Sequence, residues 1–131
     1  MYRCFLRSKI HLATVTESNL AYEGSITIDS DLLKAADILP YERVEILNVH
    51  NGARFSTYAL EGMPGSGDIC LNGAAARLAS RGDIVIILTY HEVPHDQAPH
   101  VKPRMVYVDE HNRIKSTKNA DAWMNDLVAA K

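Results

Sequence analysis

The stretch that decides the fold is Asp83-Ile84-Val85-Ile86-Ile87-Leu88-Thr89-Tyr90, in the second half of a 131-residue chain. Its five central residues are aliphatic, and all but the last of these are β-branched. A short apolar run without polar alternation is typical of a strand that is buried on both faces. The segment therefore predicts the central strand of a β-sheet core.

Short apolar or alternating segments, separated by turn residues, extend outward from this run in both directions. Such a pattern is typical of a small barrel or sandwich and predicts a mainly β fold. The other expected strands are Tyr2 to Leu6, Leu12 to Thr16, Ser25 to Asp29, Arg43 to Asn48, Phe55 to Leu60, Asp68 to Leu71 and Arg104 to Val108.

Helices are expected to be few and short. Ser30 or Asp31 can cap one that ends at Ala36, and Asn72 can cap another that runs from Gly73 to Ala79. The proline- and histidine-containing segment from Val93 to Pro103 is expected to form a loop. The segment from Asn119 to Ala130 has apolar residues at helical spacing, which favours a docked or fraying helix.

The composition is that of one compact domain over residues 1–131, with 47% hydrophobic and 23% charged residues. A formal charge of −2 gives no basic surface for nucleic acid or an anionic membrane. Cys4 and Cys70 are too few for a disulfide framework and lack the paired spacing of a zinc site. No apolar run resembles a signal peptide or a membrane span, so a cytoplasmic location is expected.

The pair Gly24-Ser25 carries a specific chemical possibility. A serine hydroxyl that follows glycine can approach the preceding carbonyl closely, because glycine tolerates the strained conformation that this requires. An N-to-O acyl shift then gives an ester, β-elimination gives dehydroalanine, and hydrolysis leaves a pyruvoyl group at the new N-terminus. Gly-Ser is also a frequent turn dipeptide, so the pair alone does not decide between the two readings.

Four other segments accompany this pair. They are Lys9-Ile10-His11, Asn51-Gly52-Ala53-Arg54-Phe55-Ser56-Thr57-Tyr58, Gly65-Ser66-Gly67 and Asn72-Gly73-Ala74-Ala75-Ala76-Arg77-Leu78. In this order and at these spacings the chain resembles the pyruvoyl-dependent aspartate 1-decarboxylases, from Met1 to about Tyr90. The later part of the chain matches that family only loosely.

The resemblance implies a small double-psi β-barrel that assembles as a homotetramer. It implies a zymogen that cleaves itself between Gly24 and Ser25 into a β chain, residues 1–24, and an α chain, residues 25–131. Ser25 would become the pyruvoyl group, which takes the substrate amine as a Schiff base and accepts the electrons released by decarboxylation. The implied reaction converts L-aspartate to β-alanine and CO2 for pantothenate and coenzyme A biosynthesis, without a metal or a diffusible cofactor.

The resemblance also assigns the site residues. Arg54 matches the substrate arginine, and Tyr58 matches the proton donor. Lys9 matches the second cationic position, where its ammonium could orient a carboxylate or favour the developing charges. Thr57 matches a substrate contact whose hydroxyl could also stabilise the oxyanion of the acyl shift. The alternative role for Thr57 and Tyr58 is packing within the fold. Strand alternation puts the two side chains on opposite faces unless the strand ends or bulges there.

The run from Asn72 through Gly73, Ala74 and Ala75 matches the substrate-binding segment, where small residues expose backbone amides at a helix start. An Asn-capped, alanine-rich helix without a ligand is the alternative reading of that run. His11 and Tyr22 are weaker candidates near the cleavage site, and the histidines after Tyr90 do not have the spacing of a zinc site.

One departure from the family and two alternative functions stay open. Leu47 stands where well-known members have a tryptophan, so the pocket shape is expected to differ. Cleavage could instead leave Ser25 intact as the N-terminal nucleophile of a hydrolase, or the chain could be an uncut, non-catalytic binding module. Some family members mature only with a separate protein, so a maturation factor is a further possible partner.

Overall fold

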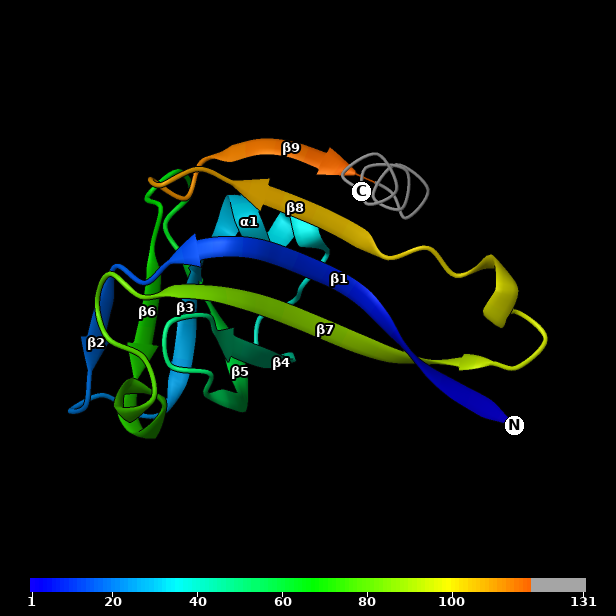
Figure 1. The fold of residues 1–131 in the computed structure, drawn as a ribbon, viewed down its shortest axis with the longest axis horizontal. Helices are drawn as coiled ribbons and strands as arrows, with labels where there is room; N and C mark the ends of the chain where they lie inside the picture. Colours follow the sequence, from blue (N-terminus) through cyan, green and yellow to red (C-terminus); the bar gives the residue numbers. More distant parts are fainter. Residues whose placement is uncertain (119–131) are drawn as a thin grey trace.

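Residues 1–118, which the computed structural model describes, form nine strands that hydrogen-bond into one mixed sheet (Figure 1). In sequence order the strands are β1 (Tyr2–Thr14), β2 (Glu17–Asn19), β3 (Ser25–Asp29), β4 (Arg43–Asn48), β5 (Arg54–Gly62), β6 (Ile69–Asn72), β7 (Ile84–Pro94), β8 (Arg104–Val108) and β9 (Ile114–Lys118). Across the sheet the order is β2-β6-β3-β5-β4-β7-β1-β8-β9. The mainly β prediction is confirmed, and closure as a double-psi barrel stays a prediction.

Three helical segments accompany the sheet in the described residues. They are the α-helix α1 (Ser30–Ala36) and the short 3-10 helices η1 (Gly73–Arg77) and η2 (Ala98–His100). Figure 1 shows α1 against β1 and β8, while η1 lies at the opposite end of β6 and β3. None of the helices within residues 1–118 is long and apolar enough to cross a membrane.

The predicted central strand is β7, which pairs antiparallel with both β1 and β4. Val85 and Ile87 are fully buried, but Ile84 and Ile86 are only half-buried. Burial on both faces is therefore wrong for the first part of this strand. In strands, successive side chains point to opposite faces, and within this chain only one face of β7 packs fully into the core there.

The first two expected strands are one long strand, β1, as Figure 1 shows. Its register with β7 shifts between Leu6 and Ser8 and again between Ile10 and Ala13. Leu12 has a left-handed backbone at φ 61°, as a bulge residue can. These irregularities break the period-two pattern, and for this reason the sequence suggested two strands.

Other corrections concern the ends of elements. β7 continues to Pro94 and η2 follows it, so the expected 93–103 loop is partly ordered as a strand and a helix. Strands β2 and β9 were not predicted. The helix expected over residues 119–130 lies outside the described residues.

Helix α1 covers the predicted residues, but its cap is Asp29. The Asp29 Oδ1 accepts a hydrogen bond from the Asp31 amide at 2.8 Å, and the same carboxylate accepts from the amides of Gly65 and Gly67. One buried side chain therefore ties the start of α1 to the turn before β6. This fixes the end of β3, the strand that begins with Ser25.

The core lies on one face of β3, β5 and β6. The fully buried side chains on this face include Ile26, Ile28, Ala59, Ile69 and Leu71. Because side chains alternate along a strand, the residues between them face the other side of the sheet. Ser25 and Asn72 are on that other side, and there the site is built.

Candidate active site

Ser25 begins β3 and lies directly opposite Asn72, the last residue of the antiparallel neighbour β6. Both residues are buried, Ser25 with only 1% of its surface exposed. The Asn72 Nδ2 donates hydrogen bonds to the Ser25 Oγ at 3.0 Å and to the Thr27 Oγ1 at 3.2 Å. The side chain of Asn72 therefore orients the Ser25 hydroxyl, and it does not cap the helix that follows.

Gly24 has room among the residues around it, its two chain neighbours apart. Its φ is outside the left-handed region, and a methyl group added there would lie 3.9 Å from the Ala74 nitrogen and the Asn72 carbonyl oxygen. These are ordinary van der Waals distances. The tight position is Gly73, which has φ 61° and packs against the backbone of Tyr22 and Gly24.

The run after Asn72 is a 3-10 helix of five residues, in place of the expected α-helix to Ala79. So short a segment has few aligned peptides, so a helix dipole adds little to its exposed backbone amides. Ala75 packs into the hydrophobic core, whereas Ala74 is exposed with its amide beside Gly24. The structure thus brings the first residues of the run beside Gly24 and Ser25.

A cleft of about 400 Å³ opens beside Ser25. Its lining residues are Glu17, Tyr22, Glu23, Ser25, Thr27, Leu60, Asp68, Cys70 and Asn72. Burial, followed by the charges of Glu17 and Asp68, raises the pKa of the Cys70 thiol. The cleft of one chain is therefore an acidic environment, and its lining includes none of the predicted cationic residues.

Tyr58 lies on the same face of the sheet as Ser25. Strands β3 and β5 are parallel, with Thr27 paired to Leu60, and cross-strand partners share a face. Tyr58 precedes Leu60 by two residues as Ser25 precedes Thr27, so the two are neighbours on adjacent strands. The tyrosine is partly exposed on this face.

Thr57 faces the other way. The pairing of β5 with β4 runs from Arg54 to Tyr58 without a register shift, so no bulge brings Thr57 and Tyr58 to one face. Thr57 is half-buried and lies opposite the core residue Val44. Within one chain, the structure does not bring Thr57 to the cleft.

Arg54 is exposed at the start of β5, four residues or about 13 Å along the strand from Tyr58. Its cross-strand neighbour is the half-buried Leu47, the position that departs from the family. Arg54 and Tyr58 share a face because even-numbered residues of β5 alternate with its core-facing ones. Arg54 therefore lies on the same face of the sheet as Ser25 but is remote from it along the strand.

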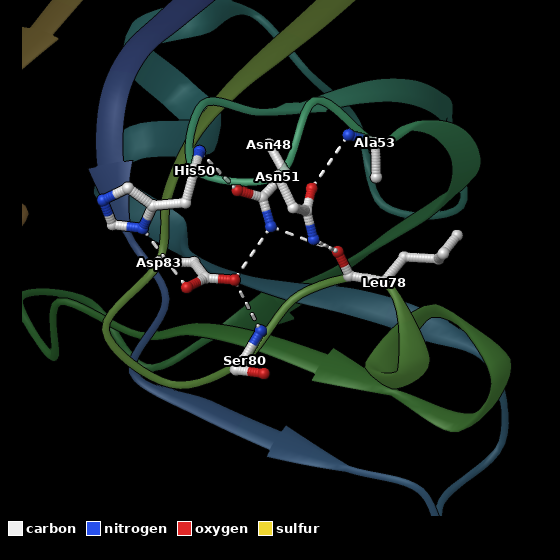
Figure 2. Close-up of polar contacts among 7 residues, drawn as sticks. All are labelled: Asn48, His50, Asn51, Ala53, Leu78, Ser80 and Asp83. Carbon is white, nitrogen blue, oxygen red and sulfur yellow. Dashed lines mark hydrogen bonds and ion pairs between the residues drawn. The ribbon is translucent and has the colours of Figure 1, made fainter.

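A polar cluster ties the turn before Arg54 to the end of η1 (Figure 2). Asn48 and Asn51, at either side of this turn, both donate from their Nδ2 atoms to the Leu78 carbonyl at 3.1 Å. The Asn51 Oδ1 in turn accepts from the Ala53 amide. The segment that leads to Arg54 and the segment that contacts Ser25 are thus parts of one hydrogen-bonded unit.

Asp83 lies at the centre of this cluster (Figure 2). Its carboxylate accepts from the Ser80 amide and the Asn48 Nδ2, both at 2.9 Å, and lies 3.2 Å from the His50 Nδ1. The Ser80 hydrogen bond is the main cause that lowers the pKa of Asp83, with smaller contributions from Asn48 and His50. The ionised carboxylate is therefore the form that the cluster stabilises.

Lys9 lies on the Ser25 face of the sheet but far from Ser25. Through the pairings of β1, β7, β4 and β5, Lys9 shares its face with Leu88, Glu45 and Ser56. Four inter-strand steps separate β1 from β3, which is about 19 Å of sheet. A lysine side chain does not cover this separation within one chain.

His11 is next to Lys9 and is equally remote from Ser25 along the sheet. Its ring meets that of Tyr107 edge to face, with centroids 5.6 Å apart. Burial lowers the pKa of Lys9, and burial together with the Lys9 charge lowers the pKa of His11. The weaker candidate Tyr22, by contrast, lines the cleft and is 62% exposed.

Several residues of the site were not predicted. They are the acidic lining residues Glu17, Glu23 and Asp68, with Thr27, Cys70, Asn48 and Asp83. None of them belongs to a motif, and their positions depend on which strands pair. Alternation along β3 and β6 is the one local signal that could have placed Thr27 and Cys70 beside Ser25 and Asn72.

Comparison with known proteins places the chain in a family. The family model described as aspartate decarboxylase matches residues 1–115. The chain therefore belongs to the aspartate decarboxylase family. The match continues past Tyr90 as far as residue 115.

Curated relatives give the same result over nearly the whole chain. Aspartate 1-decarboxylase from Syntrophotalea carbinolica is 60% identical over 127 residues, which cover 97% of each protein. Aspartate 1-decarboxylase from Thermoanaerobacter pseudethanolicus is 56% identical, covering 86% of this chain and 97% of the relative. The protein of the same name from Dehalococcoides mccartyi is 53% identical, covering 92% of this chain and 97% of the relative.

Proposed function

We propose that this chain decarboxylates L-aspartate to β-alanine and CO2 through a pyruvoyl group made from its own Ser25. Membership of the aspartate decarboxylase family supports the reaction class, a carboxy-lyase acting on aspartate. The observation that carries the proposal is the buried Ser25, whose hydroxyl is oriented by Asn72 beside a cleft. Neither the hydrolase nor the binding module is supported by this family membership.

Self-cleavage begins at the Ser25 hydroxyl. Its oxygen attacks the Gly24 carbonyl carbon, the peptide C–N bond breaks, and the Ser25 nitrogen takes up a proton. The Asn72 Nδ2 hydrogen bond, at 3.0 Å, limits rotation of this hydroxyl and so favours one approach. Elimination and hydrolysis then release ammonia and separate residues 1–24 from residues 25–131.

The local residues fit a small substrate at this position. A cleft of about 400 Å³ is in the size range of small-molecule sites, and Ser25 lies at its wall. The pyruvoyl group would supply an electrophilic ketone and an electron sink. Tyr58, on the neighbouring strand and the same face, would donate the proton to the former α-carbon.

Recognition of aspartate needs cations, and one chain does not provide them in the cleft. Its lining contains Glu17, Glu23 and Asp68, while Lys9 lies about 19 Å away along the sheet. We therefore propose that copies of the chain assemble, as the homotetramer that the resemblance implies, and that Lys9 of one copy serves the cleft of another. Arg54 would bind a substrate carboxylate with its planar guanidinium.

Isotope-labelled substrate tests the reaction. Purified enzyme should release labelled CO2 from aspartate labelled at the α-carboxyl carbon and none from aspartate labelled at the β-carboxyl carbon. Ser25→Ala should release none from either, whereas Ser116→Ala, in the edge strand β9 and outside the lining of the cleft, should behave as wild type. Full turnover by Ser25→Ala would refute the proposed mechanism.

A further inference from the structure

The backbone of Gly73 packs closely against residues 22–24, the segment that precedes Ser25. Gly73 has φ 61°, a conformation that costs other residues free energy. A methyl group added there would lie 2.5 Å from the Gly24 nitrogen, 2.7 Å from the Gly24 Cα and 2.7 Å from the Tyr22 carbonyl oxygen. No side chain fits at this position while residues 22–24 keep their place.

Gly24, unlike Gly73, does not restrict this backbone contact. A methyl group at Gly24 would have no heavy atom of its surroundings closer than 3.9 Å. The cleavage segment therefore has room of its own, and the η1 side determines how closely the two backbones approach. This contact lies one residue from Asn72, whose side chain holds the Ser25 hydroxyl.

The segment that carries Gly73 is anchored from behind. The Ser18 Oγ lies 3.0 Å from the carbonyl oxygens of Ala76 and Ala79 and donates to them. The Nδ2 atoms of Asn48 and Asn51 donate to the Leu78 carbonyl (Figure 2). Because these donors come from β2 and from the β4–β5 turn, η1 does not withdraw from the cleavage segment without breaking bonds to two other parts of the fold.

We propose that residues 72–79 act as a clamp that holds the Gly24–Ser25 peptide in the conformation that cleaves, with Gly73 as its positioning residue. Gly73 acts on the bond through its contact with residues 22–24, and Asn72 acts on the attacking oxygen. This inference rests on the proposed self-cleavage and concerns what controls its rate. It gives Gly73 a role in maturation that is separate from substrate binding.

The test compares two glycine-to-alanine variants by the rate at which fragment 25–131 forms. Gly73→Ala should slow cleavage by at least about 100-fold, because displacement of reacting groups by about 1 Å costs that much. Gly82→Ala is the matched control: Gly82 is also left-handed, at φ 92°, but a methyl group there has nothing within 4 Å. It carries the backbone cost without the collision and should cleave within about 3-fold of wild type.

Ser18→Ala approaches the same clamp without adding an atom, so it keeps the test decisive if Gly73→Ala does not fold. Loss of two carbonyl contacts should slow cleavage by about 10-fold in a chain with a native circular-dichroism spectrum. Ser18→Thr retains a hydroxyl and should restore the rate, which a general loss of stability would not explain.

The outcomes separate this inference from the proposed function. Folded Gly73→Ala that cleaves at the wild-type rate overturns the clamp and leaves self-cleavage standing. If Gly73→Ala is unfolded, cleavage of Ser18→Ala at the wild-type rate overturns the clamp as well. A wild-type chain that remains uncleaved after incubation with cell extract contradicts the proposed function itself.

Discussion

The region around β3, β6 and η1 differs from the region around β1 and the start of β5 in how completely one chain builds it. In the first, Ser25, Asn72 and Gly73 are in direct contact and buried or tightly packed. In the second, Arg54 is about 13 Å along its strand from Tyr58, and Lys9 is about 19 Å across the sheet from Ser25.

The chemistry proposed for each region accounts for the difference. Self-cleavage is an intramolecular reaction, so its groups must be held together by the fold of a single chain. Substrate recognition depends on groups that another copy can supply after assembly. The lining of the cleft is acidic, with Glu17, Glu23 and Asp68, so binding of the two carboxylates of aspartate there would need a cation from outside the cleft.

Assemblies that contain two different variants test most strictly whether one site is built from two copies of the chain. Lys9→Met and Ser25→Ala should each be inactive alone, but their co-assembly should restore about a quarter of wild-type activity, because sites then form with an intact Ser25 and an intact Lys9 from different copies. Activity is measured on co-expressed, co-purified chains. Separately purified chains that cannot exchange are the control, and no recovery in true mixed assemblies would place Lys9 and Ser25 of one chain in the same site.

Tyr58→Phe should separate the chemical step from maturation. Loss of the proton donor should lower kcat by about 100-fold or more, since general acids contribute 10²–10⁴-fold, while the chain still cleaves. Stopped turnover assays and a denaturing gel measure the two effects on one sample. Tyr2→Phe removes an exposed phenol at the far end of β1 and should change neither. Unchanged kcat in Tyr58→Phe would remove this tyrosine from the mechanism.

Arg54→Ala should weaken substrate recognition and spare cleavage. A charged hydrogen-bonding partner contributes about 1.5–3 kcal/mol, so kcat/KM for aspartate should fall about 10- to 100-fold. Arg54→Lys should recover only part of this, because an ammonium lacks the bidentate fork. Arg81→Ala, an exposed arginine in the turn before β7, is the control. Equal losses in both arginine variants would indicate a nonspecific effect of charge.

Of these variants, Asp83→Asn should have the smallest effect, a slight decrease in the free energy of unfolding. The pKa of Asp83 is lowered in the folded state, so its contribution is present above the unfolded carboxyl pKa of about 3.9 and is lost as pH falls through the folded value. The variant should be less stable than wild type by about 1 kcal/mol or less near pH 7, a value limited by solvent access to this group.

The pH series is the decisive part of that measurement. In urea unfolding, the difference between Asp83→Asn and wild type should shrink toward zero in acid, as the pH falls below the unfolded carboxyl pKa of about 3.9 and through the lower folded value. Asp96→Asn, at an exposed loop carboxylate, should track wild type throughout. A gap that stays constant with pH would mean that the cluster in Figure 2 does not favour the ionised carboxylate.

Local patterns were sufficient for part of the fold. Segments 25–29, 43–48 and 104–108 have the predicted bounds, because apolar alternation between turn residues is a property of the segment itself. Bulges in β1 hid its continuity, and β2, with only Glu17, Ser18 and Asn19, is a strand solely because it pairs with β6. Neither a bulge nor a partner strand can be read from a local pattern.

The site shows the same limit. The motifs indicated Ser25, Asn72 and Tyr58, but the hydrogen bond between Ser25 and Asn72 joins residues 47 positions apart and depends on the register of β3 with β6. The sequence singled out Gly24 for its lack of a side chain, and the close backbone contact made by Gly73 was not predicted. Steric requirements of this kind arise from tertiary packing, which no spacing rule encodes.

Intact-protein mass spectrometry of the purified chain after warm incubation shows directly whether the chain cleaves itself and converts Ser25 to a pyruvoyl group. We expect fragments 1–24 and 25–131. The larger fragment should be about 17 Da lighter than a serine-terminated peptide, because one ammonia is lost when the pyruvoyl group forms. A larger fragment with an unmodified N-terminal serine, or a chain that stays whole even beside cell extract, would contradict this expectation.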